Sequence, residues 1–313
     1  MTENMPAELE ELGIKVKQEP SNLKLRRSYA DALLENNFPE LSLNEYKYLM
    51  GIFSNDPVIH FNVGVIYEKL ENIELAEKSY RKAIEISPND PDFHYNLAFL
   101  LDQKKQIDEA IQEYLKTIKL NYDDENAHFN LAYLYAKQNK SVDAIRHFEI
   151  AVKLKPDDVY AHFHLGNEYS KIDQIQKALD EYQKVIQISP DYSWAYYNIA
   201  CILYEQCKID EAVCYFKKTI DVNPKDIDAL KTLANIMIAQ KEYTLALNYF
   251  EAIIVQEPNN SDVHYNAAQV YKSLNEFDDA IFHLEKALEF KENLSISVIQ
   301  IISEIKDLEK LKS

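Results

Sequence analysis

The chain has 313 residues, a formal net charge of −18 and a sequence pI of about 4.9. Only 4 residues are glycine, whereas 22 are tyrosine. Binding to nucleic acid depends on lysine and arginine side chains that neutralise phosphates, so an acidic chain without a basic stripe predicts no nucleic-acid partner. The scarcity of glycine argues against phosphate-binding loops and against sheets built from tight hairpins.

Residues 1–20 contain no apolar segment of the kind found in signal peptides, and we expect them to be flexible. No apolar run in the chain approaches the length of about 20 residues that a membrane-spanning helix needs. The 3 cysteines have no CxxC spacing, which predicts neither a disulfide framework nor a structural zinc site. Together these features predict a cytoplasmic protein with no membrane partner and no metal or other cofactor.

Residues 21–56 predict a pair of helices. The apolar positions of the two helices are Tyr29, Ala30 and Leu33, then Tyr46, Leu49 and Ile52. Pro39 and the lack of an alanine in the second helix make this pair irregular compared with the segments that follow. We expect a degenerate repeat that caps the N-terminal end of an array.

Residues 57–294 repeat every 34 residues without insertion or deletion. We number the places within a repeat from its first residue, so that Pro57 holds the first place. The eighth place is small in every repeat: Gly64, Ala98, Ala132, Gly166, Ala200, Ala234 and Ala268. The twentieth place is alanine: Ala76, Ala110, Ala144, Ala178, Ala212, Ala246 and Ala280. The twenty-fourth place is bulky, and the thirty-second is proline at Pro88, Pro156, Pro190, Pro224 and Pro258.

The spacing of these residues predicts two antiparallel helices in each repeat. In the repeat 125–158, Ala132 and Tyr135 lie on one helical stripe, and Ala144 lies on a second stripe with Phe148. Two helices approach closely where both side chains are small, as at Ala132 and Ala144. Proline cannot continue the second helix because it lacks an N–H. A single hairpin cannot bury its apolar faces, so we expect the repeats to stack around a continuous core.

This pattern resembles the tetratricopeptide repeat family over residues 57–294. The resemblance implies an all-α fold, a right-handed superhelical solenoid of helix-turn-helix hairpins in which the first helix of each hairpin lines a concave groove. It implies that the second, fifth, sixth, ninth, twelfth and thirteenth places face or border that groove. It also implies a scaffold that binds proteins or peptides.

Histidine replaces the family's usual tryptophan at the fourth place in five repeats: His60, His94, His128, His162 and His264. A ladder of metal ligands is one interpretation. However, neighbouring helices lie about 8–10 Å apart, whereas a zinc ligand lies about 2 Å from its metal. We therefore expect half-buried rings packed between repeats and no metal site.

The fifth place is aromatic in six repeats: Phe61, Tyr95, Phe129, Phe163, Tyr197 and Tyr265. In the remaining repeat it is Lys231. The ninth place adds Phe99, Tyr133, Asn167 and Asn235. Exposed aromatic side chains offer large contact areas at low entropic cost. We predict that this set lines a peptide-binding groove; the alternative is that the rings pack sideways against the neighbouring repeat.

Asparagine holds the sixth place in five repeats: Asn62, Asn96, Asn130, Asn198 and Asn266. Asparagine inside a helix costs about half a kcal/mol relative to alanine, and its amide can pair with both the N–H and the C=O of an extended peptide. We predict a ladder that binds peptide backbone; the alternative is a set of local hydrogen bonds. The ladder resembles the repeat array of the O-linked N-acetylglucosamine transferases, without their catalytic domain.

Some members of the family clamp the carboxylate tail of heat-shock chaperones with five residues on three successive repeats. Lys231, Asn235 and Asn266 match the first three places of that clamp. Ile296 and Gln300 fall where lysine and arginine are expected, and without those charges most of the charge-assisted hydrogen bonds are missing. The sequence therefore disfavours chaperone-tail binding.

Residues 295–313 predict one more helix, with an apolar stripe formed by Ile299, Ile302, Ile305 and Leu308. The charges on its other faces are balanced rather than basic. This favours a C-terminal capping helix over an amphipathic helix that lies on a membrane surface.

The sequence contains no Ser/His/Asp arrangement, nucleophile elbow or Walker loop, which predicts a protein without enzymatic activity. We expect a scaffold that holds an extended peptide or a partner helix in the concave groove. Two alternatives stay open. One is an assembly factor or co-chaperone that binds folded subunits through convex or edge surfaces. The other is the substrate-recruiting subunit of a glycosyltransferase.

Overall fold

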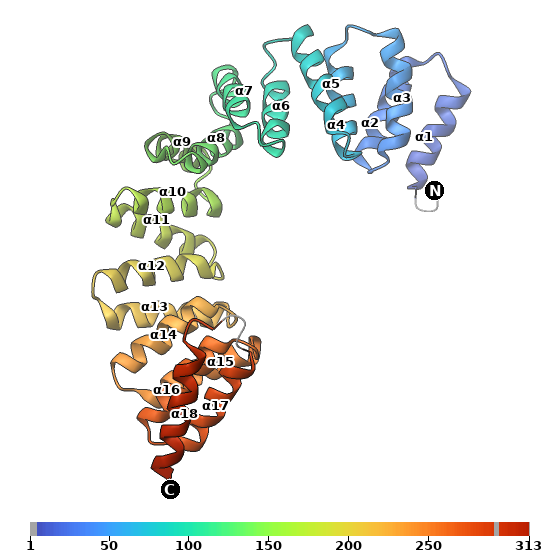
Figure 1. The fold of residues 1–313 in the computed structure, drawn as a ribbon. Coiled ribbons are helices and arrows are strands. Elements are labelled where there is room, and N and C mark those ends of the chain that lie inside the picture. The colour runs from blue at the N-terminus through green and yellow to red at the C-terminus, as the bar shows by residue number, and fades with distance from the viewer. Residues whose placement is uncertain (1–4, 291–293, 313) are drawn as a thin grey trace. The chain divides into compact units, whose positions relative to one another are not determined.

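The computed structural model describes residues 5–290 and 294–312, and every regular element within them is an α-helix (Figure 1). The first helices of the hairpins are α2 (Leu23–Glu35), α4 (Pro57–Lys69), α6 (Pro91–Gln103), α8 (Glu125–Lys137), α10 (Val159–Lys171), α12 (Ser193–Glu205), α14 (Ile227–Ala239) and α16 (Ser261–Ser273). The second helices are α3 (Pro39–Ile52), α5 (Ile73–Ile86), α7 (Ile107–Leu120), α9 (Ser141–Leu154), α11 (Ile175–Ile188), α13 (Ile209–Val222), α15 (Tyr243–Gln256) and α17 (Phe277–Glu289). A helix α1 (Ala7–Gln18) precedes them, and α18 (Val298–Lys312) follows.

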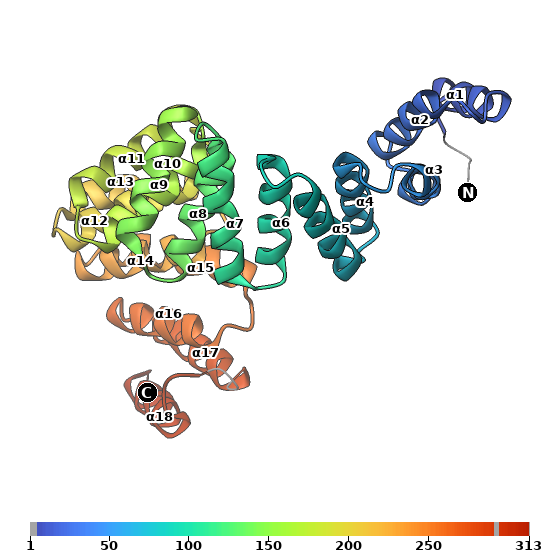
Figure 2. The same cartoon turned by 90° about the horizontal axis from the view of Figure 1, so that it is seen from above.

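The chain divides into two compact halves, Met1–Pro156 and Asp157–Ser313. Within each half, a first helix packs on the second helix of its own hairpin, and that second helix packs on the next first helix. Figure 2 shows α4, α5 and α6 side by side in the N-terminal half, and Figure 1 shows α10 to α13 following one another in the C-terminal half. The predicted all-α solenoid of stacked hairpins is confirmed.

The small residues of the eighth and twentieth places lie in the core, as predicted. Ala132, Ala144 and the ring of Phe148 are fully buried. The glycines at the eighth place lie directly against the ring at the twenty-fourth place. A Cβ atom added to Gly64 would lie 2.6 Å from the Tyr80 ring, and one added to Gly166 would lie 2.7 Å from the Tyr182 ring. The first helix therefore touches the second through its backbone at these two places.

Each turn between the two helices of a hairpin contains one residue with a positive φ, and none of these residues is glycine: Asn37, Glu71, Lys105, Asn139, Asp173, Cys207, Lys241 and Asn275. In the turn after α6, the N–H of Gln106 donates to the Leu101 carbonyl at 2.9 Å, and the N–H of Lys105 donates to the Asp102 carbonyl at 2.8 Å. This pair of bonds satisfies carbonyls that the end of a helix leaves free. The fold thus uses left-handed turn residues without needing more glycine.

Part of the negative charge serves to begin helices. Aspartate side chains accept hydrogen bonds from backbone N–H groups at the start of five first helices: Asp56, Asp90, Asp124, Asp158 and Asp226. A carboxylate at this position satisfies free N–H groups and favours the helix dipole. Among the described residues, no helix combines the length and the apolar character needed to cross a membrane.

The described N-terminal region contains a helix that the sequence does not predict. We expected residues 1–20 to be flexible, but Ala7–Gln18 form α1, which packs on α2 and buries Leu9 and Val16. In the next hairpin, Ser42 takes the place of the missing alanine, and its hydroxyl donates to the Ala30 carbonyl at 2.7 Å. Pro39 is the first residue of α3, where proline is tolerated because no intrahelical partner for its N–H is needed.

The C-terminal helix packs with only part of the predicted stripe. Ile301 and Leu308 are buried, and Ile305 packs against the same cluster, whereas Ile299 and Ile302 are exposed. Ile301, Ile305 and Leu308 are spaced by four and three positions, which places them on one face of α18 against α17. The helix covers the last hairpin, but the prediction that Ile299 and Ile302 would be buried is wrong.

Ala144→Leu is expected to lower the free energy of unfolding by about 1–3 kcal/mol, because a larger side chain overpacks a filled core. Val142→Leu changes an exposed position of the same helix and is the control, with an expected change within about 0.5 kcal/mol. Chemical denaturation followed by circular dichroism measures both. Equal stability of Ala144→Leu and the unchanged chain would contradict the contact described here.

Gly64→Ala and Gly51→Ala are expected to change stability in opposite directions. Both glycines are helical, but a Cβ at Gly64 meets the buried Tyr80 ring, whereas a Cβ at Gly51 meets nothing within 4 Å. Gly51→Ala should stabilise the protein by up to about 1 kcal/mol through helix propensity, and Gly64→Ala should destabilise it by about 1–3 kcal/mol. Thermal melting compares the two, and a stabilised Gly64→Ala variant would refute the close approach.

Candidate functional site

The aromatic rings of the fifth place are half-buried, and five of them pack on the ring at the twenty-fourth place of their own hairpin. The centroid distances are 5.6 Å for Phe61–Tyr80, 5.7 Å for Tyr95–Tyr114, 5.6 Å for Phe129–Phe148, 5.9 Å for Phe163–Tyr182 and 5.8 Å for Tyr197–Phe216. Phe61 also stacks on Phe93, the third residue of the next repeat, at 5.0 Å. Each ring therefore contributes to packing while part of it stays accessible.

The asparagine amides of the sixth place are held by hydrogen bonds inside the molecule. Nδ2 of Asn62 donates to the Tyr46 hydroxyl, that of Asn96 to the Asp92 carbonyl at 2.8 Å, that of Asn130 to the Tyr95 hydroxyl at 3.0 Å, and that of Asn198 to Asn167 Oδ1 at 3.0 Å. Asn266 is exposed. Within the described part of the chain, Oδ1 of Asn96 accepts no hydrogen bond. The Asn96 amide thus makes the kind of local bond that the alternative interpretation expects and keeps an acceptor and a second donor for a ligand.

The predicted ninth-place residues differ in their surroundings. Tyr133 is half-buried, and its ring lies 4.5 Å from Lys137 Nζ. Asn167 Oδ1 accepts from the Tyr182 hydroxyl at 2.7 Å as well as from Asn198. Asn235 is exposed. Asn167 therefore stabilises the first helices of two successive hairpins, whereas the Asn235 side chain is open to solvent.

A pocket of about 530 Å³ is bounded by α4, α5 and α6 in the N-terminal half. We call it the α4–α6 pocket, and its lining residues are Val65, Glu68, Lys69, Tyr80, Tyr95, Asn96, Phe99 and Gln103. They hold the ninth, twelfth and thirteenth places of one repeat and the fifth, sixth, ninth and thirteenth places of the next, together with the ring of the twenty-fourth. Two successive hairpins therefore bring the places implied by the family resemblance into one pocket.

The α4–α6 pocket combines one apolar anchor with several hydrogen-bonding groups. Phe99 is 41% exposed. The Tyr80 hydroxyl donates to Glu68 Oε2 at 2.9 Å, and Gln103 Nε2 lies 3.3 Å from Glu68 Oε1. Burial, reinforced by Glu68, raises the pKa of Tyr80 well above its usual range, and burial also raises the pKa of Tyr95. Both phenols therefore remain protonated at neutral pH, and each keeps an O–H group that can donate a hydrogen bond.

The twelfth- and thirteenth-place side chains in this pocket were missed as individual site residues. Glu68, Lys69 and Gln103 are polar residues at the end of a first helix, where a solvated surface is the ordinary interpretation. The signal that could have identified them was their position at the twelfth and thirteenth places, which the family resemblance assigns to the groove. Only the stacking of α4 on α6 through α5 shows that they meet Asn96 and Phe99 in one pocket.

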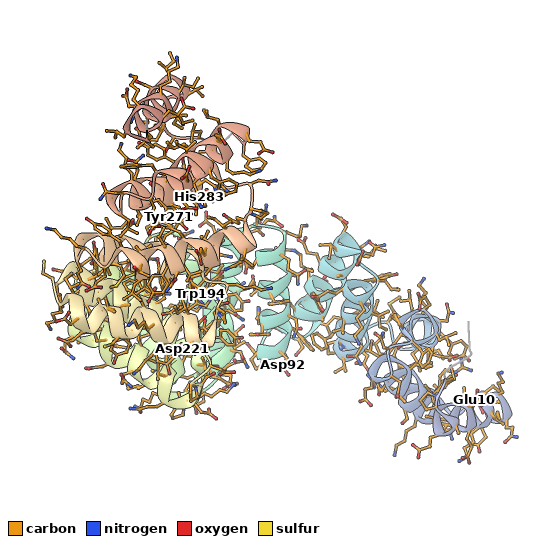
Figure 3. All side chains as sticks on the ribbon, turned by 90° about the horizontal axis from the view of Figure 1, so that it is seen from below. Glu10, Asp92, Trp194, Asp221, Tyr271 and His283 are labelled. Atoms are coloured by element: carbon orange, nitrogen blue, oxygen red, sulfur yellow. The ribbon has the colours of Figure 1, made fainter. Side chains whose placement is uncertain are left out.

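The histidines of the fourth place form hydrogen bonds with the backbone and with second helices. In the repeat 125–158, His128 Nε2 lies 3.0 Å from the Tyr122 carbonyl, and its Nδ1 lies 2.9 Å from His147 Nδ1. His264 repeats this arrangement with the Pro258 carbonyl and His283. Tyr271 stacks on His283 with ring centroids 5.2 Å apart (Figure 3). These four histidines form two ring pairs inside the array. The described residues contain no group of three or more His, Cys, Asp or Glu placed to hold a metal ion.

The places of the chaperone-tail clamp are surrounded by acidic groups. Lys231 lines a cavity of about 550 Å³ together with Glu257 and Asp262. At the other end of the clamp, Gln300 Nε2 donates to the Tyr265 hydroxyl at 3.2 Å and to Glu304 Oε1 at 3.1 Å. Glu304 would repel an incoming carboxylate, which agrees with the prediction that this protein does not clamp such a tail.

Family models match most of the repeat region. Tetratricopeptide repeat models match residues 57–90, 79–112 and 125–158, and a TPR repeat model matches 101–139 and 166–206. The chain is a tetratricopeptide repeat protein. Within this protein, residues 205–287 also match the model described as anaphase-promoting complex, cyclosome, subunit 3. No curated protein matches the chain, and the resemblance to the O-linked N-acetylglucosamine transferases stays a prediction.

Solved structures of other tetratricopeptide repeat proteins share the fold. The C-terminal part of a TPR repeat-containing protein from Cytophaga hutchinsonii is 21% identical, with a TM-score of 0.68, over 76% of this chain and 97% of that one. YrrB, described as a TPR protein with an unusual peptide-binding site, is 20% identical with a TM-score of 0.56, over 60% of this chain and 96% of that one. MamA is 24% identical with a TM-score of 0.51, over 53% of this chain and 97% of that one.

The two histidine pairs are expected to make this tetratricopeptide repeat protein sensitive to acid. His128 Nε2 donates to a carbonyl, so its Nδ1 accepts a hydrogen bond from the Nδ1–H of His147, and both rings are neutral. Burial, followed by the repulsion that a second protonated ring would meet from His128, lowers the pKa of His147 to about 4, and the pKa of His283 falls to about 4 in the same way beside His264. The unfolded chain binds these protons near pH 6.5, so stability is complete above that pH and is lost as the pH falls toward 4.

His147→Glu with His283→Glu tests this pH dependence, because Glu113 and Glu181 hold the same place in other repeats. Melting temperatures are compared between about pH 7 and about pH 5. The double variant is expected to lose less stability on acidification than the unchanged chain. An identical loss in both proteins would show that the histidine pairs do not control the acid response.

Proposed function

We propose that this protein is an interaction scaffold that binds an extended peptide along the first helices of its hairpins. The α4–α6 pocket is the observation that carries the proposal. It is concave, it holds an exposed aromatic side chain at Phe99, and it contains an oriented amide at Asn96. The description of YrrB as a repeat protein with a peptide-binding site supports the same use of this fold.

The pocket chemistry suits a peptide with one apolar side chain in each bound segment. Phe99 and the Tyr95 ring offer apolar contact, while the free acceptor and donor of Asn96 can pair with the peptide backbone. The Asn130 amide, which donates to the Tyr95 hydroxyl, lies on the next first helix. Because both amides are already oriented, binding loses little side-chain entropy.

The triple variant Asn96→Ala, Asn130→Ala and Asn198→Ala tests the asparagine ladder. A binding peptide is first selected from a random library displayed on phage, and its affinity is then measured by calorimetry. Each lost hydrogen bond contributes about 0.5–1.5 kcal/mol, so the affinity should fall by at least about tenfold while thermal unfolding stays cooperative. Val142→Ala, on an exposed position of α9, is the matched control. Unchanged affinity in the triple variant would rule out the ladder.

A second candidate is a subunit that holds folded partners in a larger complex. The match of residues 205–287 to subunit 3 of the anaphase-promoting complex favours it. A photo-crosslinking residue placed at Phe99, inside the α4–α6 pocket, or at Val142, on a second helix, separates the two. Crosslinks of the selected peptide from Phe99 alone support the groove, and crosslinks of a folded partner from Val142 alone support the second candidate.

A further inference from the structure

The N-terminal half contains another cavity, of about 810 Å³, on α3, α4 and α5. Met50, Val63, Tyr67 and Leu75 supply its apolar lining. Its polar lining residues are His60, Glu74, Glu77, Lys78, Ser79, Arg81, Lys82 and Glu85. It shares no lining residue with the α4–α6 pocket, and we call it the His60 cavity.

In two other hairpins, a glutamate side chain occupies the place that corresponds to the His60 cavity. His94 Nδ1 lies 2.6 Å from Glu113 Oε2, and Lys116 Nζ lies 2.8 Å from the other oxygen of that carboxylate. His162, Glu181 and Lys184 repeat the arrangement, with distances of 2.6 and 2.9 Å. Burial favours the protonated form of Glu181, but hydrogen bonds from His162 and Lys184 outweigh burial and lower the pKa of the carboxyl. In both hairpins a buried carboxylate lies between an imidazole and an ammonium group.

The hairpin of α4 and α5 keeps the imidazole and the ammonium group but lacks the carboxylate. His60 and Lys82 hold the places of His94 and Lys116, whereas Ser79 holds the place of Glu113. The Ser79 hydroxyl donates to the Leu75 carbonyl at 2.8 Å. His60 Nε2 lies 2.8 Å from the Ser54 carbonyl, and in the described part of the chain His60 Nδ1 has no partner. The short side chain of Ser79 therefore leaves the His60 cavity open beside two groups that bind carboxylates elsewhere in the array.

We propose that the His60 cavity binds a glutamate or aspartate side chain of a partner polypeptide, together with apolar residues beside it. The carboxylate takes the place that Glu113 takes in the next hairpin, against His60 Nδ1 and Lys82 Nζ. The apolar residues pack on Met50, Val63, Tyr67 and Leu75. The volume is large enough for several side chains, since ligand pockets commonly measure about 300–1,000 Å³.

The charged groups that line the cavity leave Lys82 and His60 available to a carboxylate from a partner. Lys82 pairs with Glu85 at 2.8 Å, but the pair is exposed, with 41% and 69% of the two side chains accessible, and such pairs contribute little. Glu77 is held by Arg81 and by Lys104, so it does not compete for His60. Lys78 is exposed, and among the described residues it forms no ion pair. An incoming carboxylate can replace Glu85 as the partner of Lys82 and also accept a hydrogen bond from His60.

The tautomer of His60 predicts that the affinity for a carboxylate depends on pH. Because Nε2 donates to the Ser54 carbonyl, a neutral His60 has only a lone pair at Nδ1, and a hydrogen bond to a carboxylate requires the protonated ring. Binding therefore takes up one proton wherever the free imidazole is neutral. The affinity is expected to weaken as the pH rises above the range in which histidine titrates. The other charged groups that face the cavity are Glu74, Glu77, Lys78, Arg81, Lys82 and Glu85.

Ser79→Glu tests the proposal within the chain, and Ser79→Gln is its matched control of equal size. The glutamate should reproduce the bond between His94 and Glu113. It should raise the melting temperature above that of Ser79→Gln and keep His60 protonated to a higher pH in an NMR titration, with the His60 signal assigned from a His60→Gln variant. Equal melting temperatures and equal His60 titration in the two variants would overturn the proposal.

Calorimetry with the full chain tests the partner directly. The probes are N-acetyl-Leu-Glu-Leu-amide and its glutamine counterpart, N-acetyl-Leu-Gln-Leu-amide. The glutamate probe should bind at least about tenfold more tightly, and binding should be lost in Ser79→Glu and weakened in Lys82→Met. Equal binding of the two probes, or binding that survives Ser79→Glu, would overturn the proposal. Hexanoate that binds as tightly as the glutamate probe would assign the cavity to small carboxylic acids and overturn the assignment to a polypeptide.

Discussion

Every hairpin depends on one close contact between its two helices. The eighth place of the first helix is small, and the ring or bulky side chain at the twenty-fourth place of the second helix lies against it. At Gly64 this approach is so close that a Cβ atom would lie 2.6 Å from the Tyr80 ring. Dense packing of this kind tolerates little change in volume. The contact therefore fixes the angle and the register of the two helices, and the stack is the repetition of this one arrangement.

The same contact positions the candidate binding surface. Five fifth-place rings rest on the twenty-fourth-place ring of their own hairpin, so the residues predicted to bind peptide are also part of the core edge. Phe61, for example, packs on Tyr80 and stacks on Phe93. Such rings are held in place before a ligand arrives, and a preformed surface loses less entropy on binding. Substitutions at these rings would change stability and binding together, so Phe99 and Asn96, whose amide bonds only within its own helix, report on binding more cleanly.

The sequence predicted the helices, the core places and the stacking, because each of these depends on residue types that recur every 34 residues. It did not predict α1, whose burial of Leu9 and Val16 depends on a neighbour outside the regular repeat. It placed Ile299 on the buried face of α18, because periodicity alone allows more than one apolar stripe on a short helix. The partners of the histidines were also missed, although the spacing of 19 residues between His94 and Glu113 recurs between His128 and His147. The pockets depend on side chains from three helices and could not be derived from periodicity.

Variation at a single place changes the chemistry of a hairpin without changing its fold. The twenty-third place holds Ser79, Glu113, His147, Glu181, Tyr215, Tyr249 and His283. Where it is glutamate, the fourth-place histidine gains an ion pair; where it is histidine, the two rings form a neutral pair; where it is serine, a cavity opens. The backbone tolerates all of these because the contact between the eighth and twenty-fourth places, and not this one, sets the helix geometry. A repeat array can thus acquire a binding cavity by shortening one side chain, provided that the neighbouring hairpins keep the stack intact.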